Sequence, residues 1–145
     1  MIKMKKINIL IALFAIVSVS ISCDDYEDYD TDRGNIVGFI TKERNINNIP
    51  EGGTKSATVD LFMTDLSNVD RTFSIVAVSS LTDPETAAEN YTFDDTVTFP
   101  ANTREASITV TGIDNSIEGE EYFALSVQAE GDVISGGIVS VRVRN

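Results

Sequence analysis

Residues 96–127, TVTFPANTREASITVTGIDNSIEGEEYFALSV, carry the pattern that decides the fold. Apolar and polar residues alternate through residues 106–110 and again through residues 123–127. Such a period of two is typical of β-strands that bury one face. The short segment at residues 100–103 contains proline and asparagine, which favour tight turns. This stretch therefore predicts successive strands, with a hairpin connection at residues 100–103.

The same strand pattern extends over the rest of the chain after residue 34. Further apolar or alternating segments occupy residues 36–40, 57–63, 73–78, 91–99 and 138–144. Turn residues separate these segments, no window keeps a helical period, and residues 84–89 allow one helical turn at most. The sequence predicts an all-β fold for residues 35–145, an immunoglobulin-like β-sandwich of about seven to eight antiparallel strands. An up-and-down barrel is the alternative.

The last predicted strand alternates valine with arginine. Val139, Val141 and Val143 are expected to point inward, which leaves Arg142 and Arg144 on the outside. If this strand lies at the edge of a sheet, its arginines discourage association with another edge. A second copy or a partner pairing with the same edge is the alternative. We expect the guarding role.

The N-terminal residues have the pattern of an export signal. Three lysines in the first six residues precede an apolar segment at residues 7–19. That segment is shorter than the roughly 20 apolar residues that span a membrane. Ser22 and Cys23 follow in an arrangement that resembles the lipobox of bacterial lipoproteins. The resemblance implies that residues 1–22 are a signal peptide and that Cys23 is lipidated. An uncleaved anchor helix, or a plain signal peptide followed by a free thiol, is the alternative.

An acidic run follows the cysteine. Residues 24–34 contain six acids and no aliphatic residue, which predicts a flexible tether over residues 23–34. The run resembles a signal for display on the exterior face of the outer membrane in some Gram-negative lineages, although a spacer without an address fits equally. Removing residues 1–22 takes away three lysines and no acid, so the net charge falls from −12 to −15. This charge repels nucleic acid and anionic membranes, and it suits soluble exposure, a cation or a basic partner. The membrane is an expected partner through the lipid on Cys23, and the identity of a protein or glycan partner is left open.

Several motifs from residue 90 onward occur in an order that resembles the Calx-β domain. They are Asn90-Tyr91, Phe99-Pro100, Ile108-Thr109-Val110, Asp114-Asn115 and Glu118-Gly119-Glu120-Glu121-Tyr122-Phe123. A Glu51-Gly52 turn corresponds to one near the start of that domain, and the resemblance covers residues 36–143. It implies a seven-stranded, immunoglobulin-like sandwich of the kind used in calcium sensing and in cell-surface adhesion.

The resemblance also implies a possible set of calcium ligands. Carried over by position, these are Glu51, Asp114, Glu118 and Glu121. Calcium takes six to eight oxygen ligands, several of them carboxylates. Here Asn90 and Asn115 stand where the family has aspartate, and the chain ends without the family's acidic cluster. The alternatives are that these acids are solvated turn residues, or that the loop residues hydrogen-bond their own turn.

The composition restricts catalytic chemistry. The chain has no histidine, and its single cysteine is the expected lipid site, so histidine bases and thiol nucleophiles are excluded. We therefore expect a non-catalytic binding or adhesion module rather than an enzyme. A calcium-binding domain and a carbohydrate-binding accessory lipoprotein are the alternatives. The chain has no tryptophan, which leaves Tyr91 and Tyr122 as the aromatic candidates for stacking on a sugar.

Overall fold

The computed structural model describes residues 34–145, so the predictions for the signal peptide, Cys23 and the tether lie outside the described residues. The described chain forms ten β-strands and one 3₁₀ helix. In chain order these are β1 (Asn35–Phe39), β2 (Glu43–Ile46), β3 (Thr54–Met63), β4 (Arg71–Val78), η1 (Ala88–Asn90), β5 (Tyr91–Phe93), β6 (Thr96–Phe99), β7 (Glu105–Ile113), β8 (Glu120–Gln128), β9 (Val133–Ser135) and β10 (Ile138–Arg144).

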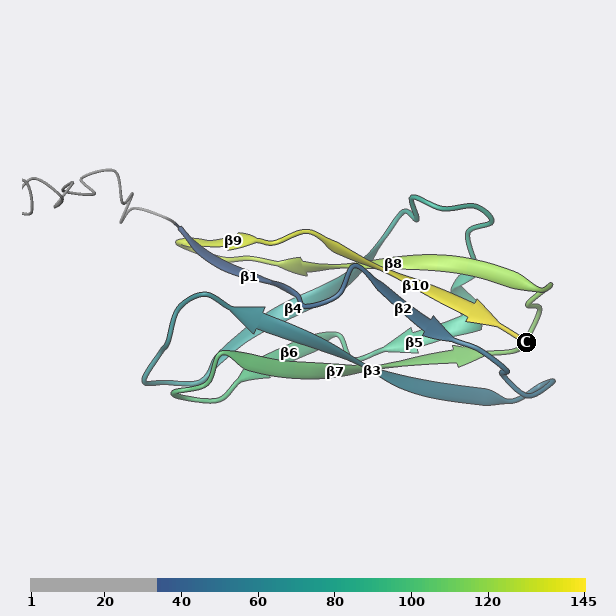
Figure 1. The fold of residues 1–145 in the computed structure, drawn as a ribbon, viewed down its shortest axis with the longest axis horizontal. Coiled ribbons are helices and arrows are strands. Elements are labelled where there is room, and N and C mark those ends of the chain that lie inside the picture. The colour runs from purple at the N-terminus through teal and green to yellow at the C-terminus, as the bar shows by residue number, and fades with distance from the viewer. Residues whose placement is uncertain (1–33) are drawn as a thin grey trace, which may run out of the picture. The chain divides into compact units, whose positions relative to one another are not determined.

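The strands form two five-stranded sheets that pack face to face (Figure 1). One sheet has the order β5-β7-β3-β1-β9, and the other has the order β2-β10-β8-β4-β6. The predicted all-β sandwich is therefore confirmed. The inward residues of both sheets meet in one core, in which the largest fully buried side chains are Phe99 and Phe123. Burying a side chain of this size contributes about 1.5–3 kcal/mol to stability.

Two segments of the chain each contribute to both sheets. The chain leaves the first sheet after β1 and enters the second as β2, and β9 and β10 make the same crossing. Because the two segments run side by side, β1 pairs with β9 and β2 pairs with β10 in parallel. The prediction of seven to eight antiparallel strands is corrected on both points. The short strands β2 and β9 were not predicted, and the crossings bring distant segments together in the same direction.

The predicted strand at residues 91–99 is divided in the same way. Its first part is β5 in one sheet, and its second part is β6 in the other. Asp94 lies at the break, where its Oδ2 accepts a hydrogen bond of 2.7 Å from the backbone N–H of Thr109. The turn at residues 100–103 is present, with Thr103 N–H donating to Pro100 O at 3.1 Å. It joins β6 to β7 across the two sheets, so the predicted hairpin is wrong.

The final strand lies in the interior of its sheet. β10 pairs with β2 on one side and with β8 on the other, so the edge-guarding role predicted for Arg142 and Arg144 is wrong. The edge strands of this sheet are β2, next to β10, and β6 at the opposite side. The inward positions of the three valines are confirmed, since Val139, Val141 and Val143 are all fully buried.

Candidate functional site

A groove opens where the two crossing segments separate. Gly136 N–H donates to Val37 O at 2.7 Å before the separation, and Ser140 N–H donates to Lys42 O at 2.9 Å after it. Between these bonds the segments leave a groove of about 490 Å³. Gly136 permits the close approach at its start, because a side-chain Cβ there would lie 3.1 Å from Val37 O.

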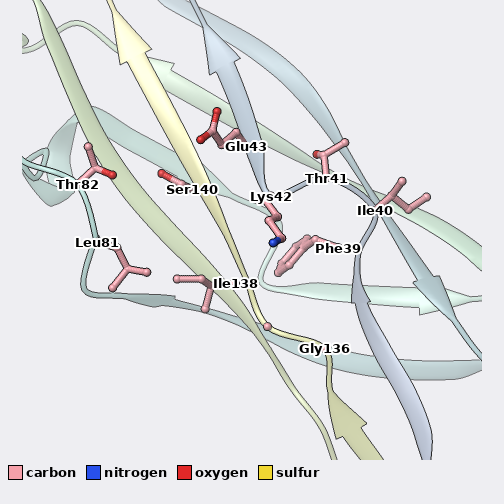
Figure 2. Close-up of a pocket in the computed structure, with 11 residues that line it drawn as sticks. Phe39, Ile40, Thr41, Lys42, Glu43, Leu81, Thr82, Gly136, Ile138 and Ser140 are labelled. Carbon is pink, nitrogen blue, oxygen red and sulfur yellow. The ribbon is translucent and has the colours of Figure 1, made fainter.

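One end of this groove is apolar. Its lining includes Phe39, Ile40, Leu81 and Ile138. Figure 2 shows the side chains of Leu81 and Ile138 extending toward the same opening. Leu81 is 84% exposed and Ile40 is 52% exposed, an unusual placement for large aliphatic side chains. This end offers apolar surface that the fold itself does not use.

The groove continues into a polar end of about 180 Å³. Glu43, Thr82 and Ser140 line both parts, so the two parts adjoin. Asn45, Tyr122 and Arg142 complete the polar end. We call the whole depression the β2–β10 groove, because strands β2 and β10 supply most of the lining of its polar end.

Hydrogen bonds hold the polar end in one geometry. Arg142 Nη1 lies 3.0 Å from Glu120 Oε2, and Arg142 Nη2 donates to Asn47 Oδ1 at 3.4 Å. The Tyr122 hydroxyl donates to the other carboxylate oxygen of Glu120. That bond holds the pKa of Glu120 below its ordinary value, with Arg142 adding to the effect, and it raises the pKa of Tyr122. The groove therefore presents a guanidinium group and a phenol, both held in place by the Glu120 carboxylate, which lies outside the lining itself.

The two tyrosines that the sequence suggests for sugar binding differ in their surroundings. The Tyr91 ring stacks on the buried Phe123 ring, with centroids 4.0 Å apart, and it packs against the core. Burial raises the pKa of Tyr91. Tyr122 instead lines the groove. Only Tyr122 is placed to contact a ligand there.

The four acids predicted as calcium ligands are not assembled into a metal site. Glu51 is exposed in the turn before β3, and Asp114 lies just after β7, where its N–H donates to Gly53 O at 2.9 Å. Glu118 and Glu121 are joined through the backbone, since Glu118 N–H donates to Glu121 Oε1 at 3.1 Å. Within residues 34–145 no three acidic side chains converge on a position that could hold a metal ion.

A buried amide occupies the centre of this region. Asn90 is 1% exposed, and its Nδ2 donates to Ser116 Oγ at 3.2 Å and to Glu121 Oε2 at 3.4 Å. Its Oδ1 accepts a bond of 3.1 Å from Ser116 N–H. Thr86 Oγ1 also donates to Glu121 Oε2, at 2.5 Å. Groups of the protein itself therefore donate hydrogen bonds to the Glu121 carboxylate. We call Thr86, Asn90, Ser116 and Glu121 the Asn90 network.

The groove was not found by reading the sequence. Leu81 is an isolated apolar residue in a polar loop, a weak signal that is also common in loops without function. The glycine pair at residues 136–137 was a stronger signal, because adjacent glycines often mark a place where backbones approach closely. In the described part of the chain, no helix is long and apolar enough to cross a membrane.

Comparisons with known proteins find similar structures but no relatives by sequence. No protein-family model and no curated protein matches this chain. A candidate carbohydrate binding protein from Bacteroides ovatus ATCC 8483 superposes with a TM-score of 0.62 and 11% identity, over 75% of this chain and 36% of that one. A multidomain protein including DUF1735, also from Bacteroides ovatus, superposes with a TM-score of 0.57 and 16% identity. The superposition covers 74% of this chain and 44% of that one.

A smaller domain has a related architecture. The ASH/PapD-like domain of human CEP192 superposes with a TM-score of 0.52 and 7% identity, over 75% of this chain and 84% of that one. Two further Bacteroides ovatus proteins also superpose on this chain, which spans between 36% and 45% of the length of these four proteins. At such low identities the likeness shows a shared β-sandwich fold and no shared activity.

Proposed function

We propose that this protein is a non-catalytic binding module, held by lipid on Cys23 at the outer membrane and facing the cell exterior, that takes its ligand in the β2–β10 groove. The observation that carries the proposal is the groove itself, which joins exposed apolar side chains to a fixed polar cluster. Binding sites of this kind combine apolar walls with a few oriented polar groups. The Calx-β resemblance fits the same role in adhesion.

The sequence before residue 34 supports the anchored location. A lipobox-like cysteine follows an export signal, and an acidic stretch connects it to the sandwich. One acyl chain gives only marginal membrane binding, whereas two or more give a stable anchor. Cys23→Ser therefore releases the protein from the membrane fraction and abolishes labelling by a palmitate analogue. Unchanged labelling in the variant would remove Cys23 as the anchor.

Carbohydrate is the ligand class that the polar end favours. A tyrosine ring offers a flat apolar face, and the Arg142 guanidinium and the Glu43 carboxylate in the lining offer donors and acceptors to vicinal hydroxyl groups. The fold likeness to a candidate carbohydrate binding protein is consistent with this choice. A groove that binds only polypeptide is the competing function, and the same experiment separates the two.

The test uses a fragment of residues 34–145, because these residues contain both sheets and the core packed between them. Retention on a glycan array is measured for the wild type, for Leu81→Asp and Tyr122→Ala in the groove, and for Leu66→Asp as the matched control. Leu66 is 48% exposed in a loop outside the groove lining. We expect at least tenfold weaker retention for both groove variants and no change for Leu66→Asp. If no glycan on the array is retained, the proposal that the ligand is a carbohydrate is wrong. If Leu81→Asp and Leu66→Asp weaken retention equally, the proposal that the ligand binds in the β2–β10 groove is wrong.

A further inference from the structure

A second depression lies on the opposite side of β2, between β2 and the start of β3. It has a volume of about 390 Å³, and its polar lining consists of Arg44, Asn45, Asn47, Asn48, Lys55 and Ser56. Buried Ile46 contributes to the apolar part of its wall. We call this depression the edge pocket. It adjoins the β2–β10 groove at Asn45, which lines both.

The edge pocket forms because β1 leaves its sheet early. β1 pairs with β3 from Val37↔Met63 to Phe39↔Leu61, and Ile40 N–H reaches Asp60 O. Beyond that point the chain has crossed to the other sheet as β2, so the first residues of β3 pair only with β7. β2 is itself an edge strand. The pocket is therefore bordered by two strand edges that have no described strand partner on that side, and such edges present unpaired backbone groups.

The charge of the edge pocket is opposite to that of the protein. The chain has 23 acids against 11 basic residues, yet the pocket lining contains Arg44 and Lys55 and no carboxylate. The ion pairs within residues 34–145 are Arg71–Asp65 and Arg142–Glu120, and they use neither pocket cation. Two cations without a neighbouring acid in the lining create a local positive potential on an acidic surface.

The lining also supplies hydrogen-bond donors in excess. Lys55 Nζ donates one bond, to Asn47 O at 2.6 Å, and its ammonium group has two further N–H donors. The Asn47 side-chain oxygen accepts from Arg142, which orients its amide and leaves the NH₂ group as a donor. The Arg44 guanidinium adds a planar set of donors that matches carboxylate, sulfate and phosphate. Donors and positive charge together select for an oxyanion.

We propose that the edge pocket binds an oxyanionic group, a carboxylate, sulfate or phosphate, and that Arg44 and Lys55 are its principal contacts. The site is open to solvent, so salt screens it and the affinity for a free ion is modest. This proposal does not depend on the ligand of the β2–β10 groove. If both sites are correct, their contact at Asn45 lets one acidic saccharide occupy both.

The experiment titrates the ¹⁵N-labelled fragment of residues 34–145 with sodium sulfate, phosphate or acetate, and with sodium chloride at matched ionic strength. We expect saturable shifts of the backbone amides of Arg44, Asn45 and Lys55 with at least one oxyanion. Arg44→Gln and Lys55→Gln each weaken this binding at least fivefold. Arg104→Gln, which removes an exposed cation outside the pocket lining, is the matched control and leaves binding unchanged.

The source of the group is tested with three polymers: dextran sulfate, which carries sulfate and no carboxylate, polygalacturonate, and neutral dextran. Preference for the sulfated or for the carboxylated polymer identifies which oxyanionic group is bound. Loss of that preference in Arg44→Gln shows that the group binds in the edge pocket. Shifts that remain linear and match those caused by chloride overturn the proposal, as does equal weakening by Arg44→Gln and Arg104→Gln. Leu81→Asp leaves anion binding intact, so failure of the groove and failure of the pocket are distinguished.

Discussion

Replacing Asn90 by aspartate exchanges an amide for a carboxylate of nearly the same shape at the most buried polar side chain of residues 34–145. The substitution removes the Nδ2 donor that lies 3.4 Å from Glu121 Oε2. It places a second negative charge at that distance instead. The shape of the core is unchanged, so Asn90→Asp isolates the electrostatic contribution of the Asn90 network.

The cost follows from two contributions. Losing a hydrogen bond to a charged group costs about 1.5–3 kcal/mol. Two like charges at this distance repel by about 5 kcal/mol at an effective dielectric constant of 20. Holding a proton on the introduced carboxyl group at pH 7 costs less, about 4 kcal/mol, and the protonated group can donate to Glu121 again. We therefore expect Asn90→Asp to lose about 3–4 kcal/mol at pH 7, with the introduced group largely protonated in the fold.

The pH dependence has a definite sign. The pKa of the introduced carboxyl group is raised in the folded state above its unfolded value of about 3.9. Below about pH 3.9 the introduced group is protonated in both the folded and the unfolded state, so its ionisation costs no stability. As the pH rises from there toward the folded pKa, the loss of unfolding free energy grows by about 1.4 kcal/mol per pH unit. Urea denaturation followed by far-ultraviolet circular dichroism, at pH 4 and pH 7, measures the difference from wild type. We expect a penalty below about 1 kcal/mol at pH 4.

The matched control is Asn102→Asp, the same chemical change at an exposed turn position. Asn102 has a left-handed φ of 61°, a conformation that aspartate also adopts, so we expect this change to alter stability by about 1 kcal/mol or less. If Asn90→Asp costs no more than Asn102→Asp at pH 7, the Asn90 network does not stabilise the fold. If its penalty is equally large at pH 4 and pH 7, the cost is steric and the electrostatic reasoning is refuted.

Three further predictions concern other parts of the sandwich. Gly112→Ala places a Cβ 2.6 Å from Ile49 Cδ1 and costs about 1–3 kcal/mol in urea denaturation, whereas an unchanged midpoint would show that Ile49 moves freely. Tyr122→Phe removes the hydroxyl donor to Glu120, so the pKa of Glu120 rises toward its ordinary value in an NMR titration, and no rise would contradict the assigned bond. Calcium and chelator give the wild-type fragment the same melting temperature, because protein donors already occupy both oxygens of Glu121; a rise of several degrees with calcium would support the calcium reading.

The inward and outward faces of the strands were predictable from the sequence. Apolar alternation marks the buried face of any strand in a sandwich, and the buried valines of β10 and Phe123 of β8 follow it. This works because each strand buries one face whichever sheet it joins. The aromatic residues at inward positions were recognisable for the same reason.

The positions of strands within the sheets were not predictable in the same way. A period of two is identical in both sheets, so the lapse in alternation at Asp94-Asp95 does not reveal that the chain crosses there from β5 to β6. The pairing of β2 with β10 depends on segments almost a hundred residues apart. Local pattern carries no information about such partners, because register and neighbours are decided by the packing of the whole sandwich.

The candidate calcium site was also predictable only in part from the sequence. Of the acids predicted for calcium, Glu51, Asp114 and Glu118 lie in loops and Glu121 lies in β8. The sequence does not show that Asn90, at the end of η1, packs against Glu121 at the start of β8. Asn90 is the deciding residue, since its buried amide satisfies Glu121 from within the protein. A single asparagine in a sequence does not reveal whether its amide is solvated or buried.

The sequence by itself determined an acidic, histidine-free β-sandwich behind a lipobox-like cysteine, because composition and alternation are local properties of the chain. Only the tertiary structure decided that two segments cross between the sheets. Each crossing separates neighbouring backbones, and this separation opens the β2–β10 groove on one side of β2 and the edge pocket on the other. Both depressions combine residues from segments far apart in the chain, so they exist only once the sheets have closed on each other.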